Sequence, residues 1–311
     1  SREQLKQIGG DPFQMTPAAL RLSRKANAVA ELHGETAREM WADVEGAAPI
    51  VAITNGVHMG TWQDAVLADH ARRSDWDSMW DRHQQHKRDL LVEIRDRVGS
   101  QFREDGLLIG FARRAATYKR ATLLIRDRKW LESRFKNDGL QFVFAGKAHP
   151  HDKFGQAFIQ ELVEAARDYP NNLVFLPNYD MHLGALLTRG TDVWLNNPIR
   201  PKEASGTSGM KAAANGVLNL SILDGWWAEG CSHGVNGWGV DAPPAGVDVD
   251  QHDREALQNL VVDDVLAAYQ DRDRWLKMMQ ASIGSASKNF SADRCVQRYF
   301  EELYGSQLTA K

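Results

Sequence analysis

Residues 107–111 read Leu-Leu-Ile-Gly-Phe, a run that is apolar throughout and has the length of a strand. Similar apolar runs follow it, each separated from the next by a stretch with helical patterning, at residues 142–146, 173–176, 193–195 and 218–221. Strands that are apolar on both faces and alternate with helices are typical of a parallel sheet covered by helices on both sides. The sequence therefore predicts an α/β fold with a doubly wound, mostly parallel sheet.

The flanking parts of the chain have mainly helical patterning. We expect helices within residues 1–48, 64–98, 119–135, 153–169, 180–188, 209–215, 253–283 and 291–304, with Ser291 as the N-cap of the last one. One short strand is predicted at residues 50–54. The polar run 81–86 contains two histidines, and we interpret it as a solvated helix face rather than a metal cluster.

Composition and charge exclude several classes of protein. The chain has 311 residues, 43% hydrophobic and 25% charged, which is ordinary for a folded globular domain. Its net charge of −3 gives no bulk attraction to nucleic acid or to an anionic membrane. No apolar run is long enough for a membrane span, and the two cysteines form neither a zinc motif nor a disulfide framework. We therefore expect a cytoplasmic protein without nucleic acid or membrane partners.

The strongest candidate for chemistry is residues 203–211, which read Glu-Ala-Ser-Gly-Thr-Ser-Gly-Met-Lys. Glycines and small residues let backbone N–H groups approach an anion, and the N-terminus of the helix that follows favours a phosphate. Lys211 can act there as a point charge or, if its pKa is lowered, as a Schiff-base former. The alternative is an ordinary Gly/Ser-rich connection with an exposed lysine.

A second candidate follows the strand at 107–111. Arg113, Arg114, Lys119 and Arg120 are crowded there, which is costly unless an anion neutralises them, although a solvated helix start would also fit. Three more polar loops, at 54–58, 146–150 and 177–180, also follow predicted strands. Ligands of doubly wound sheets bind at the carboxyl ends of the strands, so we predict that these loops converge on an anion site for more than one phosphate.

Several strings in the sequence resemble the α-glucan phosphorylases, in particular their short bacterial and archaeal branch. They occur in the family's order, from about residue 20 to the end of the chain: Asn55-Gly56 with Trp62, residues 110–120, Gly146-Lys147-Ala148, Pro177-Asn178-Tyr179, residues 192–198, residues 203–211 and residues 224–229. The string at 203–211 is highly specific for this family.

The resemblance implies a GT-B glycosyltransferase fold, of which this chain would be the C-terminal, Rossmann-like half. It also implies cleavage of the terminal α-1,4 link of a glucan by inorganic phosphate, which yields α-glucose 1-phosphate with retention. The implied cofactor is pyridoxal 5′-phosphate, whose 5′-phosphate exchanges a proton with the substrate phosphate. The resemblance also implies that the intact enzyme forms a homodimer.

The family's residue roles carry over by position. Lys211 matches the lysine that holds pyridoxal phosphate as a Schiff base, and Thr207, Ser208, Tyr179 and Trp62 match other cofactor contacts. Arg113 matches a cation on the cofactor phosphate, Arg114 matches the arginine on the substrate phosphate, and Lys119 matches the lysine between the two phosphates. The residues that match glucose contacts are Asn55, Glu203, Ala204, Ser205 and Gly206.

The resemblance also implies a division of the chain. Residues 1–48 would be a helical remnant of the front domain or the hinge, residues 49–289 the cofactor- and phosphate-binding domain, and residues 290–311 a crossing helix. We expect the front domain to be missing and the chain alone to be inactive. Two alternatives stay open: a nucleotide-sugar glucosyltransferase of the GT-B fold, similar to glycogen or starch synthase, and a non-catalytic module that binds phosphate or glucan.

Overall fold

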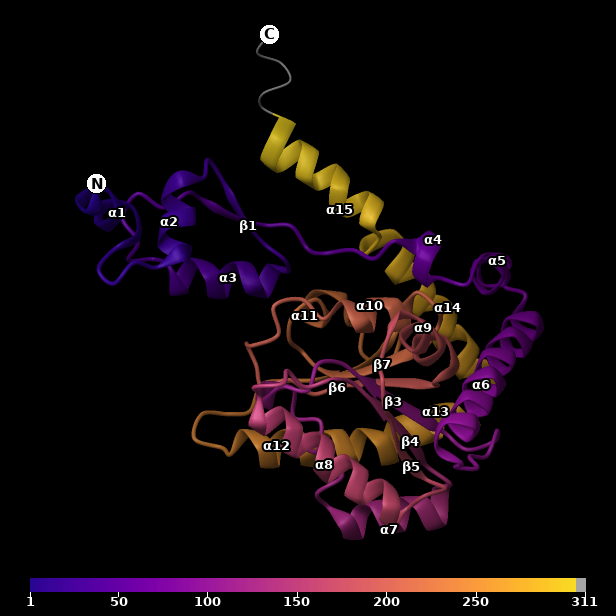
Figure 1. Ribbon diagram of the computed structural model, residues 1–311. Coiled ribbons are helices and arrows are strands. Elements are labelled where there is room, and N and C mark those ends of the chain that lie inside the picture. The colour runs from indigo at the N-terminus through magenta and orange to yellow at the C-terminus, as the bar shows by residue number, and fades with distance from the viewer. Residues whose placement is uncertain (306–311) are drawn as a thin grey trace.

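Six parallel strands form the central sheet of the computed structural model, which describes residues 1–305 (Figure 1). They are β3 (Leu108–Ala112), β4 (Gln141–Ala145), β5 (Leu173–Leu176), β6 (Val193–Asn196), β7 (Leu218–Ile222) and β8 (Gly237–Val240). Their spatial order is β5-β4-β3-β6-β7-β8, so the chain starts in the middle, winds to one edge, returns and winds to the other. This is the topology of doubly wound dinucleotide-binding folds, and the predicted fold class is confirmed. Strand β8 was not predicted, because Gly237 and Gly239 interrupt its apolar pattern.

Helices cover both faces of this sheet. Alternate residues of each strand point to opposite sides; on β3, Leu108 and Ala112 belong to one apolar core, and Ile109 and Phe111 belong to the other. The first core is closed by α6 (Trp76–Val98), α9 (Met181–Gly190) and α10 (Thr207–Ala213). The second is closed mainly by α7 (Arg128–Asp138), α8 (Lys153–Asp168), α12 (Val249–Leu260), α13 (Leu266–Gln270) and α14 (Arg272–Asn289), with a π-helical turn at Val261–Val265 between α12 and α13. Figure 1 shows α7, α8 and α12 below the sheet and α9 and α10 above it.

A smaller unit precedes the sheet. It consists of α1 (Arg2–Gly9), α2 (Met15–Leu22), α3 (Glu31–Met40) and a two-stranded parallel sheet in which β1 (Ala26–Ala28) pairs with β2 (Ile50–Ala52). The helical pattern expected within residues 1–48 was therefore wrong at residues 26–28, where the backbone pairs with β2 instead of forming a helix. The predicted strand at 50–54 exists, but it belongs to this small sheet and not to the central one.

Two chain segments connect the small unit to the six-stranded domain, and they pair with each other. The amide of Val57 donates to the carbonyl of Phe290 (2.8 Å), and the amide of Ala292 donates to the carbonyl of Val57 (2.9 Å). Gly56 allows this approach, because a Cβ there would lie 2.1 Å from the carbonyl oxygen of Ser291. After the second segment come α15 (Ala292–Arg298), with Ser291 as its N-cap as predicted, and a π-helical turn at Tyr299–Tyr304. Residues 306–311 of the predicted crossing helix lie outside the described residues.

Short helical segments link the two parts. Helices α4 (Met59–Trp62) and α5 (Ala65–Arg73) lead into α6, while α11 (Trp227–Gly230) follows β7. After β3 the chain forms a 3₁₀ turn at Thr117–Lys119 and further turns, and α7 begins only at Arg128, so the expected helix over 119–135 starts later than predicted. Arg120 ends the 3₁₀ turn in the left-handed region (φ 48°), which interrupts helical geometry.

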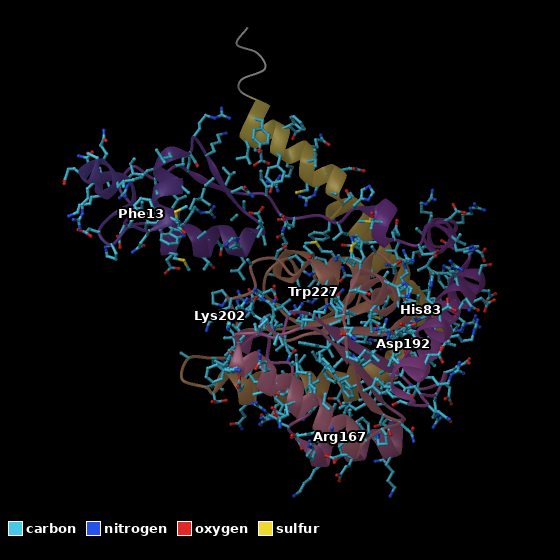
Figure 2. The ribbon with its side chains drawn as sticks, viewed as in Figure 1. Phe13, His83, Arg167, Asp192, Lys202 and Trp227 are labelled. Carbon is cyan, nitrogen blue, oxygen red and sulfur yellow. The ribbon has the colours of Figure 1, made fainter. Side chains whose placement is uncertain are left out.

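The interpretation of residues 81–86 as a solvated face was wrong for its histidines. His83 is buried and its Nε2 lies 3.0 Å from Oδ1 of Asp192 on the sheet (Figure 2). His86 is also buried, with its Nε2 3.1 Å from Oδ2 of Asp64. Within residues 1–305 no group of His, Cys, Asp and Glu is arranged to hold a metal ion. In the same range, no helix combines the length and apolar character that a bilayer crossing requires.

Candidate active site

A cavity of about 470 Å³ opens where the chain leaves β3 and β6, the two central strands from which the sheet winds in opposite directions. Its lining contains every residue that the resemblance assigned to the site except Trp62: Asn55, Arg113, Arg114, Lys119, Tyr179, Glu203, Ala204, Ser205, Gly206, Thr207, Ser208 and Lys211. Ala112, Tyr118 and Lys202 complete it. Arg120 of the predicted cationic cluster does not line the cavity and pairs with Asp250 and Asp253 instead. The loops 110–120, 177–180 and 203–211 therefore converge at the carboxyl edge, at the switch point of the sheet, whereas no residue of the loop 146–150 lines this cavity.

The cations beside β3 converge on one carboxylate. Nη1 of Arg113 lies 2.9 Å from Oε2 of Glu203, and Nζ of Lys119 donates to the same oxygen. Arg113 also donates from Nη2 to Oγ of Ser208 (3.0 Å), while its Nε is buried without an acceptor. Burial raises the pKa of Glu203, but the charges of Arg113 and Lys119 outweigh it and lower the pKa below its ordinary value. Glu203 is therefore an anion among these cations.

The ammonium group of Lys119 loses its proton more easily than that of an ordinary lysine. Burial and then the charge of Arg113 lower its pKa to about 8, although Glu203 opposes the shift. Its Nζ lies 4.6 Å from the ring centroid of Tyr118, which lines the same cavity. A nearby anion favours the charged form of a lysine, so an anion bound beside Nζ would raise the pKa of Lys119.

Lys211 projects from α10 into the cavity, and its Nζ lies 3.5 Å from the centroid of the Trp62 ring. Burial lowers the pKa of Lys211. No carboxylate of residues 1–305 forms an ion pair with this amine, so none stabilises its charged form; the neutral amine is the form that reacts as a nucleophile. Trp62 thus meets the site through Lys211 even though it does not line the cavity.

Residues of the β7–α11 connection form hydrogen bonds with the loop 203–206. Oδ2 of Asp224 accepts from the amide of Glu203 (2.9 Å), and the amide of Trp226 donates to the carbonyl of Ser205 (2.8 Å). Gly206 adopts φ 91°, which a residue with a side chain rarely does, and this turn starts α10 at Thr207. No side chain caps the first turn of α10, in which the amide of Gly209 donates to the carbonyl of Gly206 (3.1 Å).

Asn55 and Tyr179 reach the cavity from two other segments, which follow β2 and β5. Asn55 follows β2, so the expectation that its loop lies at the edge of the central sheet was wrong; Nδ2 of Asn55 nevertheless donates to Oγ of Ser205 (3.2 Å). Tyr179 follows β5, and burial raises the pKa of its hydroxyl. Gly184 leaves room for that hydroxyl, because a Cβ there would lie 2.9 Å from it.

Sequence reasoning missed Tyr118, Lys202 and Asp224 as parts of the site. Tyr118 and Lys202 stand next to predicted residues, so a wider window around Lys119 and Glu203 would have found them. Asp224 lies in the sequence string that resembles the phosphorylases, but only the fold shows that it supports the loop.

The carbohydrate phosphorylase family matches residues 62–229 of this chain. The chain belongs to that family. It is 37% identical to a maltodextrin phosphorylase of Thermococcus litoralis over 96% of its own length and 36% identical to a glycogen phosphorylase of Aquifex aeolicus over 95%. A glycogen phosphorylase of Mycobacterium tuberculosis is 36% identical over 94% of the chain. The chain spans only 41%, 50% and 40% of the length of these relatives, respectively.

The cavity of this phosphorylase-family chain fits a cofactor that carries both an aldehyde and a phosphate. Its lining has five cationic side chains, Arg113, Arg114, Lys119, Lys202 and Lys211, but a single carboxylate, Glu203. The unsatisfied Nε of Arg113 and the uncapped turn of α10 offer donors to a phosphate, while Lys211 offers an amine without a carboxylate partner.

Proposed function

We propose that this chain is the cofactor- and phosphate-binding part of an α-1,4-glucan phosphorylase. The observation that carries the proposal is the meeting of Lys211 with Arg113, Arg114 and Lys119 in one cavity at the switch point of the sheet. The names of the similar proteins from Thermococcus litoralis and Aquifex aeolicus support the substrate class, a maltodextrin or glycogen. A nucleotide-sugar transferase is not favoured, because it would leave Lys211 without a role.

In this proposal the residues of the cavity divide between two phosphates and one sugar. Lys211 holds pyridoxal phosphate, packed by Tyr179 and Trp62, while Arg113, Thr207 and Ser208 bind its phosphate. Arg114 and Lys119 hold the inorganic phosphate against it. Two adjacent phosphates repel each other, so a strongly cationic cavity is needed to keep them together.

The remaining residues orient the terminal glucose. Asn55 and the loop of Glu203, Ala204, Ser205 and Gly206 are placed to contact its hydroxyl groups. The bond between C1 and the glycosidic oxygen breaks, a bond between C1 and a phosphate oxygen forms with retention, and the proton of the inorganic phosphate moves to the departing oxygen. When bound, the cofactor supplies a phosphate that exchanges a proton with the inorganic phosphate. The products are a shorter glucan and α-glucose 1-phosphate.

We further propose that turnover needs segments equivalent to the rest of the relatives' length, because the chain spans half or less of the relatives compared above. The division predicted from the sequence, with boundaries after residues 48 and 289, is part of this proposal. The β1–β2 pair joins residues on both sides of the first boundary, so the small unit would be a hinge rather than an independent body. Cys231 and Cys295 are unpaired, which agrees with the cytoplasm as the proposed compartment.

The test is to add pyridoxal phosphate to the chain, reduce with borohydride and map the modified peptide by mass spectrometry. We expect the phosphopyridoxyl group on Lys211 and its loss in Lys211→Arg. Lys202→Arg is the matched control, since Lys202 lines the same cavity but is exposed, and it should keep the adduct. An adduct on another lysine, or none in the presence of the remaining phosphorylase segments, would contradict the proposal.

A further inference from the structure

Asn215 connects the two cofactor-site residues that are farthest apart in the sequence. It is completely buried just after α10. Its Nδ2 donates to the carbonyl oxygen of Lys211 (2.8 Å) and to the carbonyl oxygen of Trp62 (2.9 Å). Its Oδ1 accepts from the amide of Asp64 (2.8 Å). Both amide hydrogens and the amide oxygen of this side chain are thus used by backbone groups.

The contact to Lys211 replaces a helical hydrogen bond. In a regular helix the carbonyl of Lys211 would accept from the amide of Asn215, four residues later. Here that amide donates to Ala212 (2.9 Å), because the helix tightens at its end before Gly216 turns into the left-handed region (φ 74°). The side chain of Asn215 takes over the free carbonyl and so fixes the backbone from which Lys211 projects.

The contacts of Asn215 to Trp62 and Asp64 fix the segment that carries the Trp62 ring. Asp64 is held in turn by Arg82 and His86 of α6 and accepts from the amide of Leu67 (2.7 Å), so it ties the segment to the α5–α6 pair. Asn215 therefore connects the backbone of Trp62 to that of Lys211, and Asp64 connects the same segment to α5 and α6.

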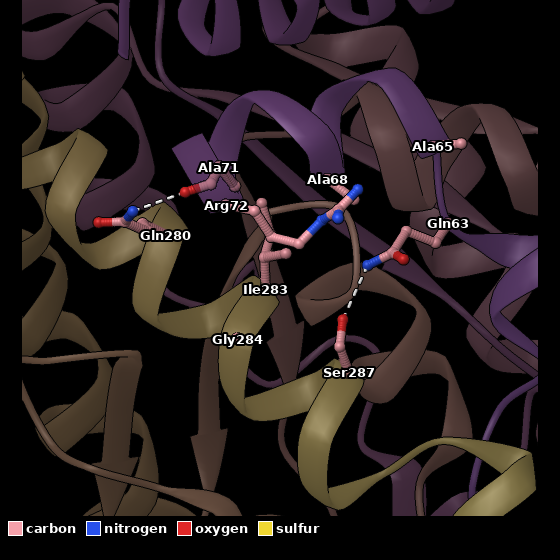
Figure 3. Close-up of a pocket in the computed structure, with 9 residues that line it drawn as sticks. All are labelled: Gln63, Ala65, Ala68, Ala71, Arg72, Gln280, Ile283, Gly284 and Ser287. Atoms are coloured by element: carbon pink, nitrogen blue, oxygen red, sulfur yellow. Dashed lines mark hydrogen bonds between the residues drawn. The ribbon is translucent and has the colours of Figure 1, made fainter. Parts of the chain in front are cut away.

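The other contacts of this segment are weaker or more exposed. Arg189 reaches the carbonyl of Trp62 only at 3.4 Å. Gln63 donates to the carbonyl of Ala214 (2.9 Å) and to Ser287 (3.0 Å), but it borders an open cavity of about 460 Å³ between α5 and α14, where water can compete (Figure 3). Asn215 makes the short, fully buried connection.

We propose that Asn215 is the positioning residue for Lys211: through its two Nδ2 hydrogen bonds it holds the Trp62 ring against the ε-amine and keeps that amine directed into the cavity. The ring covers one side of the amine at 3.5 Å, so the open side faces the space where an aldehyde would bind. The role at the cofactor rests on the proposed function, whereas the geometry belongs to the chain without it.

The test measures the ring contact directly, without the cofactor. In a chain labelled with ¹³C-lysine, an indole ring this close shifts the Hε signals of Lys211 upfield from those of the exposed lysines, and Lys211→Arg identifies them by their loss. We expect Asn215→Ala to move these signals to the position of exposed lysines. Asn215→Asp keeps the size and the acceptor but loses both donors, so it should have the same effect.

The control is Asn236→Ala. Asn236 is also buried and also bonds only backbone groups, the carbonyl of Gly230 and the amide of Ser232 (both 2.8 Å), but it does not touch Lys211 or Trp62. This variant should lose stability without moving the Lys211 signals. If they stay upfield in a folded Asn215 variant, or if the wild-type chain shows no upfield Lys211 signal, the inference is wrong.

Should Asn215→Ala fail to fold, Asn215→Asp and Trp62→Leu still decide, since Trp62→Leu must abolish the shift if the ring causes it. Trapping of pyridoxal phosphate on Lys211 is then compared between the wild-type chain and Asn215→Asp at limiting cofactor, where the variant should bind about fivefold more weakly, the effect of a lost buried hydrogen bond. A changed NMR signal with no cofactor adduct in the wild-type chain, even in the presence of the remaining phosphorylase segments, would contradict the proposed function but not the positioning role.

Discussion

Glu203 and Lys119 show at the scale of single residues how part of the cavity's positive charge is compensated in the free chain. The resemblance assigns Glu203 to glucose and Lys119 to phosphate, and those roles remain proposals. In the structure, both groups meet each other through an ion pair that Arg113 shares. Burial makes this pairing necessary, since three charged groups that are mostly shielded from water must compensate one another. A bound anion would take over the part that Glu203 plays here.

The pKa of Lys119 leads to a prediction about anion binding. Lys119 is protonated below about pH 8 and loses its charge above it, so the affinity for sulfate should fall as the pH rises through about 8. Sulfate is the suitable probe because it stays a dianion across this range. In Lys119→Arg the fall should become shallower, since arginine keeps its charge, and what remains belongs to Lys211 in the same cavity, whose pKa is also lowered. Calorimetric titration at several pH values measures this; equal pH dependence in both proteins would contradict it.

At the scale of elements, Arg120 holds together the two connections that form the cavity. Its guanidinium donates to the carbonyls of Asn197 (2.9 Å) and Pro198 (2.8 Å) in the loop after β6, and to Asp250 (2.9 Å) and Asp253 (2.6 Å) on α12. The residue is buried and directly follows Lys119. The β3 connection is thereby fixed to the loop after β6 and to a helix on the far face.

Removal of the Arg120 guanidinium should lower the free energy of unfolding substantially. Arg120→Met leaves the carboxylate of Asp253 buried without its partner, so we expect unfolding to need about 3–5 kcal/mol less free energy. Arg126→Met is the control: Arg126 pairs with Glu161 on the surface, and its loss should cost less than about 1 kcal/mol. Chemical denaturation of the two variants measures the difference, and similar costs for both would contradict the assignment.

At the scale of the whole molecule, a buried network joins α6 to the middle of the sheet. The carboxylate of Asp192 accepts from Nζ of Lys87 (2.7 Å) and the amide of Leu108 (2.8 Å), and His83 lies 3.0 Å from its other oxygen. Lys87 also donates to the hydroxyl of Tyr269 (3.1 Å), which belongs to α13. The network lies at the amino ends of β3 and β6, opposite the cavity, so it holds the two strands that carry the cavity loops.

This network predicts how stability depends on pH. Burial raises the pKa of Asp192, but Lys87 and His83 outweigh it and lower the pKa in the folded chain. The ionised Asp192 therefore contributes to the free energy of unfolding in full above the aspartate pKa of the unfolded chain. This contribution is lost as the pH falls through the lower pKa that Asp192 has in the folded chain. Lys87→Met removes the main compensating charge, so stability should drop by about 3–5 kcal/mol at neutral pH and acid loss should begin at higher pH. Thermal unfolding from pH 3 to 8 tests this; an unchanged acid limb would contradict it.

Local pattern by itself determined the doubly wound fold, the parallel strands through β7 and the gathering of the 110–120 and 203–211 loops. It could do so because apolar runs of strand length and Gly-rich connections are properties of neighbouring residues. The residues of the cavity were also named in advance, largely through the resemblance to phosphorylases, and their placement in one cavity agrees with it.

Only the tertiary structure decided the contacts between distant segments. It placed Asn55 in the loop after a second sheet, buried His83 and His86 on a helix whose sequence looks solvated, and moved the start of α7 to Arg128. It also brought Asn215 between Trp62 and Lys211. The physical reason is the same in each case: a polar side chain looks solvated in the sequence until its partner is known, and that partner comes from a segment tens to more than a hundred residues away.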